Sequence, residues 1–383
     1  MIYLDNAATS WPKPKTVIQA IVNTIQKHGA NPGRSGHKMS ISAGRIILQT
    51  RELLCSLFHV DDPFQFIFCS NCTDALNLAI KGSLKKGDHV ITTSLEHNSV
   101  LRPLKTMEQQ GKITVTILPL SNEEVTTPDQ VQKAILSNTR MVIASHASNV
   151  TGLIQPIELI GNICKKGNIL FLVDGAQTAG TIPIDLGKLP IDLFAFPGHK
   201  GLLGPQGTGA LYIRPSIIIN QLKEGGTGTD SFSLYQPADL PERYESGTLN
   251  TPGIAGLGAG INYILQYQEE LQYKENNLID SLYHEIENIK DIHLLSGGLE
   301  KPHIGVLSMN IQEYPSSVIA DMLDLKYDIA CRAGLHCAPL IHKSLGTINQ
   351  GAIRFSVSIF NTQKEIYQCI KALNEIASSL KRS

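Results

Sequence analysis

Short apolar runs alternate with helix-like segments through the middle of the chain. Seven such runs, rich in Val, Ile, Leu and Phe, lie at 65–69, 89–93, 113–119, 140–145, 169–175, 192–198 and 209–213. The segments between the first five runs, such as TDALNLAIKG and PIELIGNICKKG, space their apolar residues as helices do. This alternation predicts βαβ units and a mostly parallel sheet that helices cover on both faces. Ligands bind beyond the carboxyl ends of the strands in such a sheet, so the residues that follow each run are the first candidates for function.

A smaller unit is expected after this series. A passage rich in Gly, Ser, Thr and Pro over 224–260 ends the series, and a helical pattern extends from about 254 to 290. Beyond it, a helix is expected around 316–327, a strand over 329–334 and a closing helix from Gln363. The sequence therefore predicts a large α/β domain and a smaller α+β domain.

Composition and charge exclude several classes of protein. The 383 residues include 33 Lys and Arg against 34 Asp and Glu, so no strong field attracts nucleic acid or an anionic membrane. Seven scattered cysteines are an odd number, which does not suit a disulfide framework and fits a reducing compartment. The N-terminal residues lack the basic and apolar regions of a signal peptide, and no uncharged stretch is apolar enough to span a bilayer. We expect a cytoplasmic protein.

The residues after two neighbouring runs suggest a pyridoxal phosphate site. Asp174 follows one apolar run and Lys200 follows the next. The cofactor needs a lysine for its Schiff base and a carboxylate that keeps its ring nitrogen protonated. A structural ion pair is the alternative reading of these two residues. The ATP and dinucleotide motifs GxxxxGK[ST] and GxGxxG are missing at the expected places.

Three other runs end in residues that suit the same cofactor. After the first run, Asn71 can cap a helix whose free N–H groups face a phosphate, with Cys72 and Thr73 in its first turn. His97 follows the second run and can stack on the cofactor ring, although a buried structural histidine is the alternative. Asn149 follows the fourth run and can donate a hydrogen bond to the phenolic oxygen.

Seven segments give the chain a family resemblance. LDNAAT, EHNS, SNVTG, VDGAQ, PGHKGLLGPQGTG, ESGTLNTPGIAGLGA and RAGLHCAP occur in the same order in enzymes of the class V aminotransferase fold. The chain most closely resembles cysteine desulfurases of the SufS-like (group II) branch, for which RAGLHCAP is the most specific motif. The resemblance implies the pyridoxal-phosphate type I (aspartate-aminotransferase-like) fold. It further implies a large cofactor-binding domain over 15–255 and a small domain formed by 1–14 with 256–383.

The resemblance also implies a reaction. L-Cysteine is converted to L-alanine, and the sulfur passes as a persulfide to an acceptor protein, for iron–sulfur cluster assembly or another sulfur pathway. Lys200 corresponds to the Schiff-base lysine that then acts as general base at Cα, and Asp174 to the partner of the ring nitrogen. Cys337 corresponds to the cysteine whose thiolate attacks the substrate sulfur. His97 completes the catalytic group by stacking on the ring.

The remaining site residues are implied in the same way. The other residues that correspond to cofactor contacts are Gln177 and Asn149, near the phenolic oxygen, and His199, Cys72 and Thr73, at the phosphate. Arg354 corresponds to the arginine that binds the substrate carboxylate, with Asn149 and Arg332 beside it. Thr248 corresponds to a threonine that reaches the phosphate of the neighbouring subunit, which implies a homodimer.

The chain departs from the family pattern at three positions. Pro197 replaces a serine and so removes a phosphate donor, Cys72 replaces a threonine, and Leu335 replaces a histidine before the catalytic cysteine. The cations around Cys337 are then expected to favour its thiolate, which is the reactive form. These cations are His336, Arg332 and Arg354.

Other readings of the cysteines stay open. Cys337 is interpreted as a nucleophile, and the alternative is that it is a buried, unreactive thiol. Cys72 lies at a helix N-terminus, which is expected to lower its pKa, so it is the competing nucleophile. Cys69 and Cys72 form a CxxC pair that suits redox or metal chemistry. A zinc site is the alternative for Cys331, Cys337, His336 and His342, although we expect no metal.

The alternative functions fall into two classes. A selenocysteine lyase or an aminotransferase would use the same scaffold with another substrate or without Cys337. A non-catalytic regulator that binds sulfur or a metal would keep the fold alone, and the complete set of Lys200, Asp174 and His97 argues against it.

Overall fold

Seven strands form the central sheet of the large domain, and they coincide with the seven apolar runs. In the computed structural model, which describes residues 1–33, 36–121, 124–295 and 298–380, their order is β2 (Phe66–Cys69), β8 (Gly209–Ile213), β7 (Leu193–Pro197), β6 (Leu170–Asp174), β5 (Thr139–Ser145), β3 (Asp88–Thr93) and β4 (Ile113–Leu118). The neighbouring strands from β7 to β4 are parallel, whereas β8 is antiparallel to β7 and β2. The expected α/β fold with a mostly parallel sheet is confirmed.

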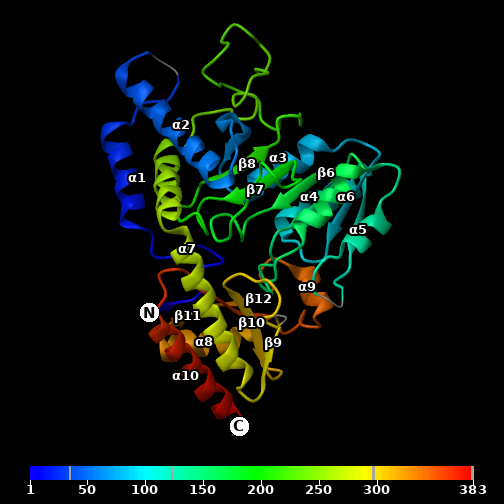
Figure 1. Ribbon diagram of the computed structural model, residues 1–383, viewed down its shortest axis with the longest axis vertical. Coiled ribbons are helices and arrows are strands. Elements are labelled where there is room, and N and C mark those ends of the chain that lie inside the picture. The colour runs from blue at the N-terminus through cyan, green and yellow to red at the C-terminus, as the bar shows by residue number, and fades with distance from the viewer. Residues whose placement is uncertain (34–35, 122–123, 296–297, 381–383) are drawn as a thin grey trace.

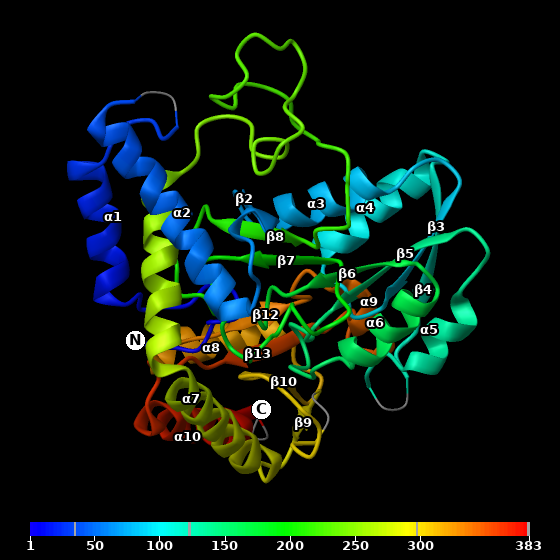
Figure 2. The same cartoon turned by 45° about the horizontal axis from the view of Figure 1, so that its top comes forward.

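Both faces of this sheet are covered by helices. On β7, Leu193 and Ala195 pack into one hydrophobic core, and Phe194 and Phe196 pack into another. The first core contains α3 (Cys72–Ser83) and α4 (Asn98–Gln109); the second contains α2 (Lys38–Phe58), α5 (Pro128–Ala134), α6 (Ile157–Lys166) and the first part of α7 (Thr251–Glu287). Figure 2 shows these helices on opposite sides of the sheet. Strands buried on both faces read as continuous apolar runs, which is why the sequence revealed them.

The small domain has its own sheet and core. The strand order is β12 (Arg332–Gly334), β13 (Ala352–Ser356), β10 (Val306–Ile311) and β9 (Ile292–Leu294), with α8 (Ser316–Tyr327) and α10 (Gln363–Leu380) packed on it. A short helix, α9 (Pro339–Ser344), packs instead against the large domain. The N-terminal strand β1 (Ile2–Tyr3) pairs with β11 (Ile329–Ala330). The single strand predicted over 329–334 is therefore wrong, because its two halves belong to different sheets.

Helix α7 joins the two cores. Its 37 residues begin beside α1 (Lys15–Lys27) and α2 and end beside α10 (Figure 1). Ile254 and Ile264 belong to the core of the large domain, whereas Leu278 and Ile286 belong to the core of the small domain. The expected domain limit at residue 255 thus falls inside this helix. The helices α1 and α2 and a 3₁₀ turn (Pro63–Gln65) are elements that the sequence patterns did not predict.

Among the described residues, no helix combines the length and apolar character needed to cross a membrane.

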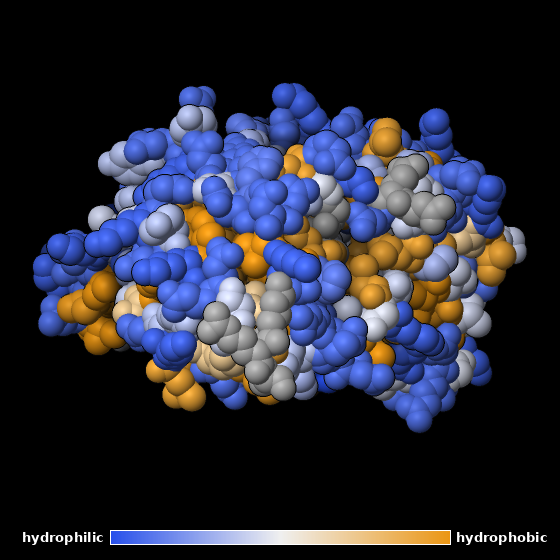
Figure 3. Space-filling view, turned by 90° about the horizontal axis from the view of Figure 1, so that it is seen from below, coloured by the Kyte–Doolittle hydropathy of each residue, from blue (hydrophilic) through white to orange (hydrophobic). Residues whose placement is uncertain are grey.

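The face of the molecule seen from below is largely hydrophilic, with apolar side chains showing across its middle (Figure 3).

Candidate active site

A cavity of about 240 Å³ lies where the carboxyl ends of the central strands meet the small domain. All the predicted site residues except Thr248 line it: Cys72, Thr73, His97, Asn149, Asp174, Gln177, His199, Lys200, Arg332, Cys337 and Arg354. The fold explains the convergence, because β6 and β7 are parallel neighbours and their carboxyl ends meet at one edge of the sheet.

Asp174 ends β6, and its two carboxylate oxygens differ in their hydrogen bonding. Oδ1 accepts hydrogen bonds from the backbone N–H of Ala176 at 2.9 Å and from the Cys72 thiol at 3.5 Å. No hydrogen bond from the described residues reaches Oδ2. Burial raises the pKa of Asp174. Burial also lowers the pKa of Lys200, although the nearby Asp174 carboxylate raises it. One oxygen is therefore available to a ring N–H, and the lysine is shifted toward the neutral amine.

Cys72 does not have the low pKa that its helix position suggested. Its side chain is 9% exposed, and burial followed by the Asp174 carboxylate raises its pKa well above the ordinary value. The expectation of an activated thiol at this helix N-terminus is therefore wrong, because desolvation and a nearby anion outweigh the helix dipole. Cys72 remains a thiol and serves as a hydrogen-bond donor.

The N-terminus of α3 faces the cavity. Asn71 caps the helix by accepting the backbone N–H of Asp74 at 2.9 Å. The Asp74 carboxylate bonds to the backbone N–H of Ser70 and pairs with Lys223, and it does not line the cavity. Within the cavity, the hydroxyls of Thr73 and Ser99 lie 2.8 Å apart. The helix end therefore offers N–H and hydroxyl donors to an anion without an opposing carboxylate.

His97 is fixed as a neutral ring. It caps α4, and its Nδ1 accepts the backbone N–H of Ser99 at 3.1 Å. Burial lowers the pKa of His97 to about 4, with the charge of Lys200 acting in the same direction. A neutral imidazole beside Lys200 suits stacking on an aromatic ring.

The opposite wall of the cavity is cationic. Arg354 is 2% exposed, and its guanidinium donates to Asp5 at 2.9 Å and to the Asn149 carbonyl at 3.0 Å. Its Nε is buried without a hydrogen-bond partner among the described residues. Arg332 stands opposite Arg354 in the register of β12 and β13. Asp5 was missed by sequence reasoning, since only the fold brings the first residues beside β13.

Cys337 is exposed, whereas His336 before it is buried. Burial lowers the pKa of His336 to about 2, so this histidine is neutral at pH 7. The expectation that His336 contributes a positive charge to Cys337 is therefore wrong. The described residues also form no group of three or more possible metal ligands, so the alternative zinc cluster around Cys331 is not assembled.

Glu96 is a second residue that the sequence did not single out. It is fully buried, and its hydrogen-bond partner Ser145 lines the cavity. Its carboxylate accepts hydrogen bonds from the Thr93 hydroxyl at 2.7 Å and from the backbone N–H and hydroxyl of Ser145 at 3.0 and 2.8 Å. Burial raises the pKa of Glu96 to about 7, against these hydrogen bonds. Its position directly before His97 was the only available signal.

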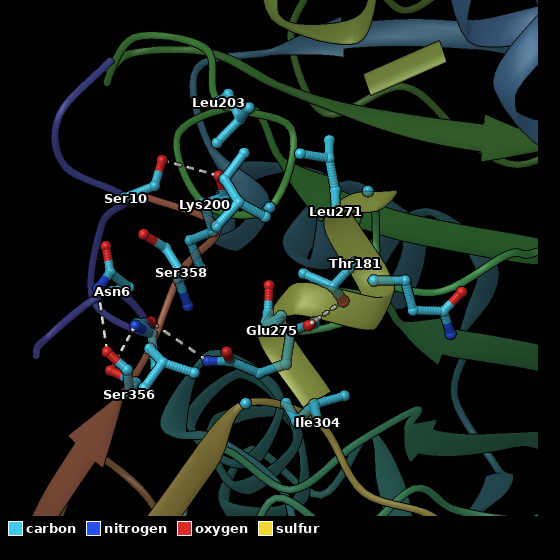
Figure 4. Close-up of a pocket in the computed structure, with 18 of the residues that line it drawn as sticks. Asn6, Ser10, Thr181, Lys200, Leu203, Leu271, Glu275, Ile304, Ser356 and Ser358 are labelled. Carbon is cyan, nitrogen blue, oxygen red and sulfur yellow. Dashed lines mark hydrogen bonds between the residues drawn. The ribbon is translucent and has the colours of Figure 1, made fainter. Parts of the chain in front are cut away.

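A smaller cavity of about 60 Å³ lies behind Lys200, with room for a few water molecules. It shares Ala7, Gln177 and Lys200 with the larger cavity. Figure 4 shows Glu275 of α7 across this space from Ser10 and Lys200. Burial raises the pKa of the half-buried Glu275 to about 7, against the hydrogen bond from the backbone N–H of Gly305.

Thr248 lies outside the cavity in which the other predicted residues meet. Its hydroxyl accepts a hydrogen bond from Asn31 at 3.2 Å, on the side of the large domain that carries α2. Within one chain, the structure therefore does not bring Thr248 to Lys200.

Comparisons with known proteins agree with this architecture. The family model described as "Aminotransferase class-V" matches residues 2–369. A probable cysteine desulfurase of Methanothermobacter thermautotrophicus is 32% identical over 383 residues, which cover 98% of this chain and 94% of the relative. Cysteine desulfurase IscS of Buchnera aphidicola subsp. Baizongia pistaciae is 33% identical and is matched over 99% of this chain and 93% of its own length.

A solved structure extends the agreement to the fold. The apo structure of a cysteine desulfurase from Thermococcus onnurineus NA1 matches with a TM-score of 0.93 and 30% identity, over 99% of this chain and 95% of that chain. The resemblance to enzymes of the class V aminotransferase fold is thus confirmed over almost the full length, and the chain belongs to the class V aminotransferase family.

Proposed function

We propose that this protein is a pyridoxal-phosphate-dependent cysteine desulfurase that forms a persulfide on Cys337. The observation that carries the proposal is a single cavity that contains Lys200, Asp174, Arg354 and an exposed cysteine. The relatives named cysteine desulfurase support the same activity. The motif RAGLHCAP supports the SufS-like branch, while relatives named IscS match at similar identity.

The residues present fit the cofactor. The free oxygen of Asp174 suits a ring N–H, the neutral His97 suits the ring face, and the N-terminus of α3 suits the phosphate. Gln177 and Asn149 would hold the side of the ring that bears the phenolic oxygen. When bound, pyridoxal phosphate withdraws electrons from the Cα and Cβ atoms of an amino acid attached to it.

The protein's own groups would carry the remaining steps. Arg354, with Arg332 beside it, would bind the substrate carboxylate, since both side chains line the cavity. The neutral amine of Lys200 would take the proton from Cα. The Cys337 thiolate would attack the substrate sulfur, so that an S–S bond forms as the Cβ–S bond breaks. The electron pair of the broken bond would remain on the substrate, protons would be added at Cβ and returned to Cα, and alanine would leave with the sulfur remaining on Cys337 for an acceptor protein.

One experiment tests this assignment. Treatment with L-cysteine should add one sulfur atom to the peptide that contains Cys337, and alanine should be released. Cys337→Ser should keep the cofactor colour and lose turnover by about 10²-fold or more, as for removal of a positioned catalytic group. A persulfide on Cys72, or a keto acid as product, would contradict the assignment and favour an aminotransferase. Turnover measured in parallel with L-selenocysteine distinguishes a selenocysteine lyase, which would prefer that substrate. A purified protein without the cofactor colour would favour a non-catalytic regulator.

We further propose that two copies complete each active site. The loop between β8 and α7 projects from the large domain (Figure 2), and Phe232, Leu234 and Tyr235 on it are almost fully exposed. Clustered exposed apolar side chains mark interaction sites. Mixing Lys200→Ala chains with Thr248→Ala chains should restore activity, because one site of the heterodimer then has both native residues. No gain on mixing would show that each site is built within one chain.

A further inference from the structure

The loop that carries Cys337 has an unusual backbone. His336 and Cys337 have φ angles of +49° and +56°, so two consecutive residues other than glycine adopt the left-handed region. This conformation costs free energy for residues with a Cβ atom, and it persists where surrounding contacts enforce it. The contacts that enforce it here therefore determine where the Cys337 thiol points.

Two hydrogen bonds from the large domain hold these residues. The Asn149 side-chain amide donates to the carbonyl of His336 at 2.8 Å. The backbone N–H of Asn98 donates to the carbonyl of Cys337 at 2.7 Å. Asn98 begins α4 just after β3, and Asn149 follows β5, so both donors lie at the strand ends that form the cavity.

Apolar packing fixes the same contact. Leu95 and Val150 of the large domain form a buried cluster with Ala338 and Ile341. Within the loop, the backbone N–H of Ala338 donates to the Leu335 carbonyl at 2.8 Å and closes a turn around the cysteine. The loop belongs to the small domain by sequence, yet it is docked on the large domain.

We propose that Asn98 and Asn149 are positioning residues that clamp the carbonyls of His336 and Cys337 and thereby hold the Cys337 thiol at the cavity. Asn149 has two amide protons, and one of them is used by His336. The other remains available to the cofactor, so the same side chain links the cofactor to the nucleophile. The clamp exists in the protein without substrate. Only its effect on sulfur transfer depends on the proposed function.

The chain offers a substitution that removes a single donor. Asn98 is the first residue of α4, a position where proline is favoured because its N–H has no partner within the helix. His97 before it has φ −68° and ψ 154°, the extended conformation that proline requires of its predecessor. Asn98→Pro therefore removes the donor to Cys337 and keeps the helix. Asn98→Ala is the matched control, because it loses the side chain and retains the N–H.

Hydrogen exchange at the Ala338 amide, whose hydrogen bond closes the turn around the cysteine, reports whether the clamp holds this turn. In the protein loaded with pyridoxal phosphate, exchange should rise at least about fivefold in Asn98→Pro relative to Asn98→Ala, which corresponds to the loss of a typical hydrogen bond. Persulfide formation on Cys337 in a single turnover should slow by about tenfold or more, because the thiol is misplaced. The spectral change on binding L-cysteine should keep the same midpoint in both variants.

The two variants exchanging at equal rates would overturn the proposal. If Asn98→Pro does not fold, as judged by circular dichroism, Asn149→Ala serves as the second variant, and unchanged exchange at Ala338 would then overturn the proposal as well. Absence of a persulfide in the wild type would instead refute the desulfurase assignment, while the difference in exchange would still report on the clamp.

Discussion

Replacing Glu96 with Gln should change how the stability of the protein depends on pH. The carboxyl is fully buried, and its pKa rises from 4.5 to about 7 on folding. A shift of about 2.5 units at about 1.36 kcal/mol per unit corresponds to ~3 kcal/mol. Because the folded state binds this proton more tightly than the unfolded state, the stabilisation is complete below about pH 4.5 and is lost as the pH rises through about 7.

Gln fits the same hydrogen bonds without a charge. Its oxygen can accept from the Thr93 hydroxyl and the Ser145 backbone, and its amide can donate to the Ser145 hydroxyl. Urea unfolding from pH 5 to 8 should therefore show Glu96→Gln gaining up to ~3 kcal/mol relative to the wild type as the pH rises. Glu313→Gln, at an exposed carboxyl, is the matched control. A difference between Glu96→Gln and wild type that stays constant with pH would refute the reasoning.

Three further substitutions test other contacts. Arg51→Ala should lower the free energy of unfolding, measured with urea, by about 3–5 kcal/mol, because it leaves the Glu245 carboxylate buried without its cation. The double variant Arg51→Met with Glu245→Gln should recover part of the lost free energy, because it removes both charges. Gly152→Ala should lower the melting temperature, because Gly152 has φ +77° and a Cβ there would lie 2.5 Å from a carbonyl of β10; an unchanged melting temperature would contradict this. Cys72→Ala should weaken pyridoxal phosphate binding by about fivefold relative to Cys72→Ser, because it removes a donor to Asp174; equal affinities in an absorbance titration would contradict this.

The fold was predictable where a strand is buried on both faces, because such a strand consists of consecutive apolar residues. Helix α1 shows the opposite case. Its apolar residues Val17, Ile18, Ile21, Val22 and Ile25 do recur at helical spacing, but Ile18, Val22 and Ile25 are exposed, so this helix carries the pattern without the burial. The split of residues 329–334 between two sheets likewise depends on the N-terminal strand, which lies far away in the sequence.

Apart from Thr248, the predicted residues line one cavity, but their charge states were not predictable from the sequence. The rule that ligands bind at strand ends located Asp174 and Lys200, because parallel strands bring their ends together. His336 and Cys72 were given the wrong electrostatic roles, since burial reverses what residue type and helix position suggest. Asp5 enters the site only through tertiary contacts, and no local pattern marks such a residue.

The length of α7 has a consequence for how this chain can change over evolutionary time. Each residue of an α-helix adds about 1.5 Å of rise and, at 3.6 residues per turn, about 100° of rotation. One residue gained or lost between Ile264, in the first core, and Leu278, in the second, would turn the whole small domain relative to the large one. Cys337 and Arg354 would then leave the cavity together. Insertions and deletions should therefore accumulate in the loop before α7 and be rare within this stretch, although it contains no catalytic residue.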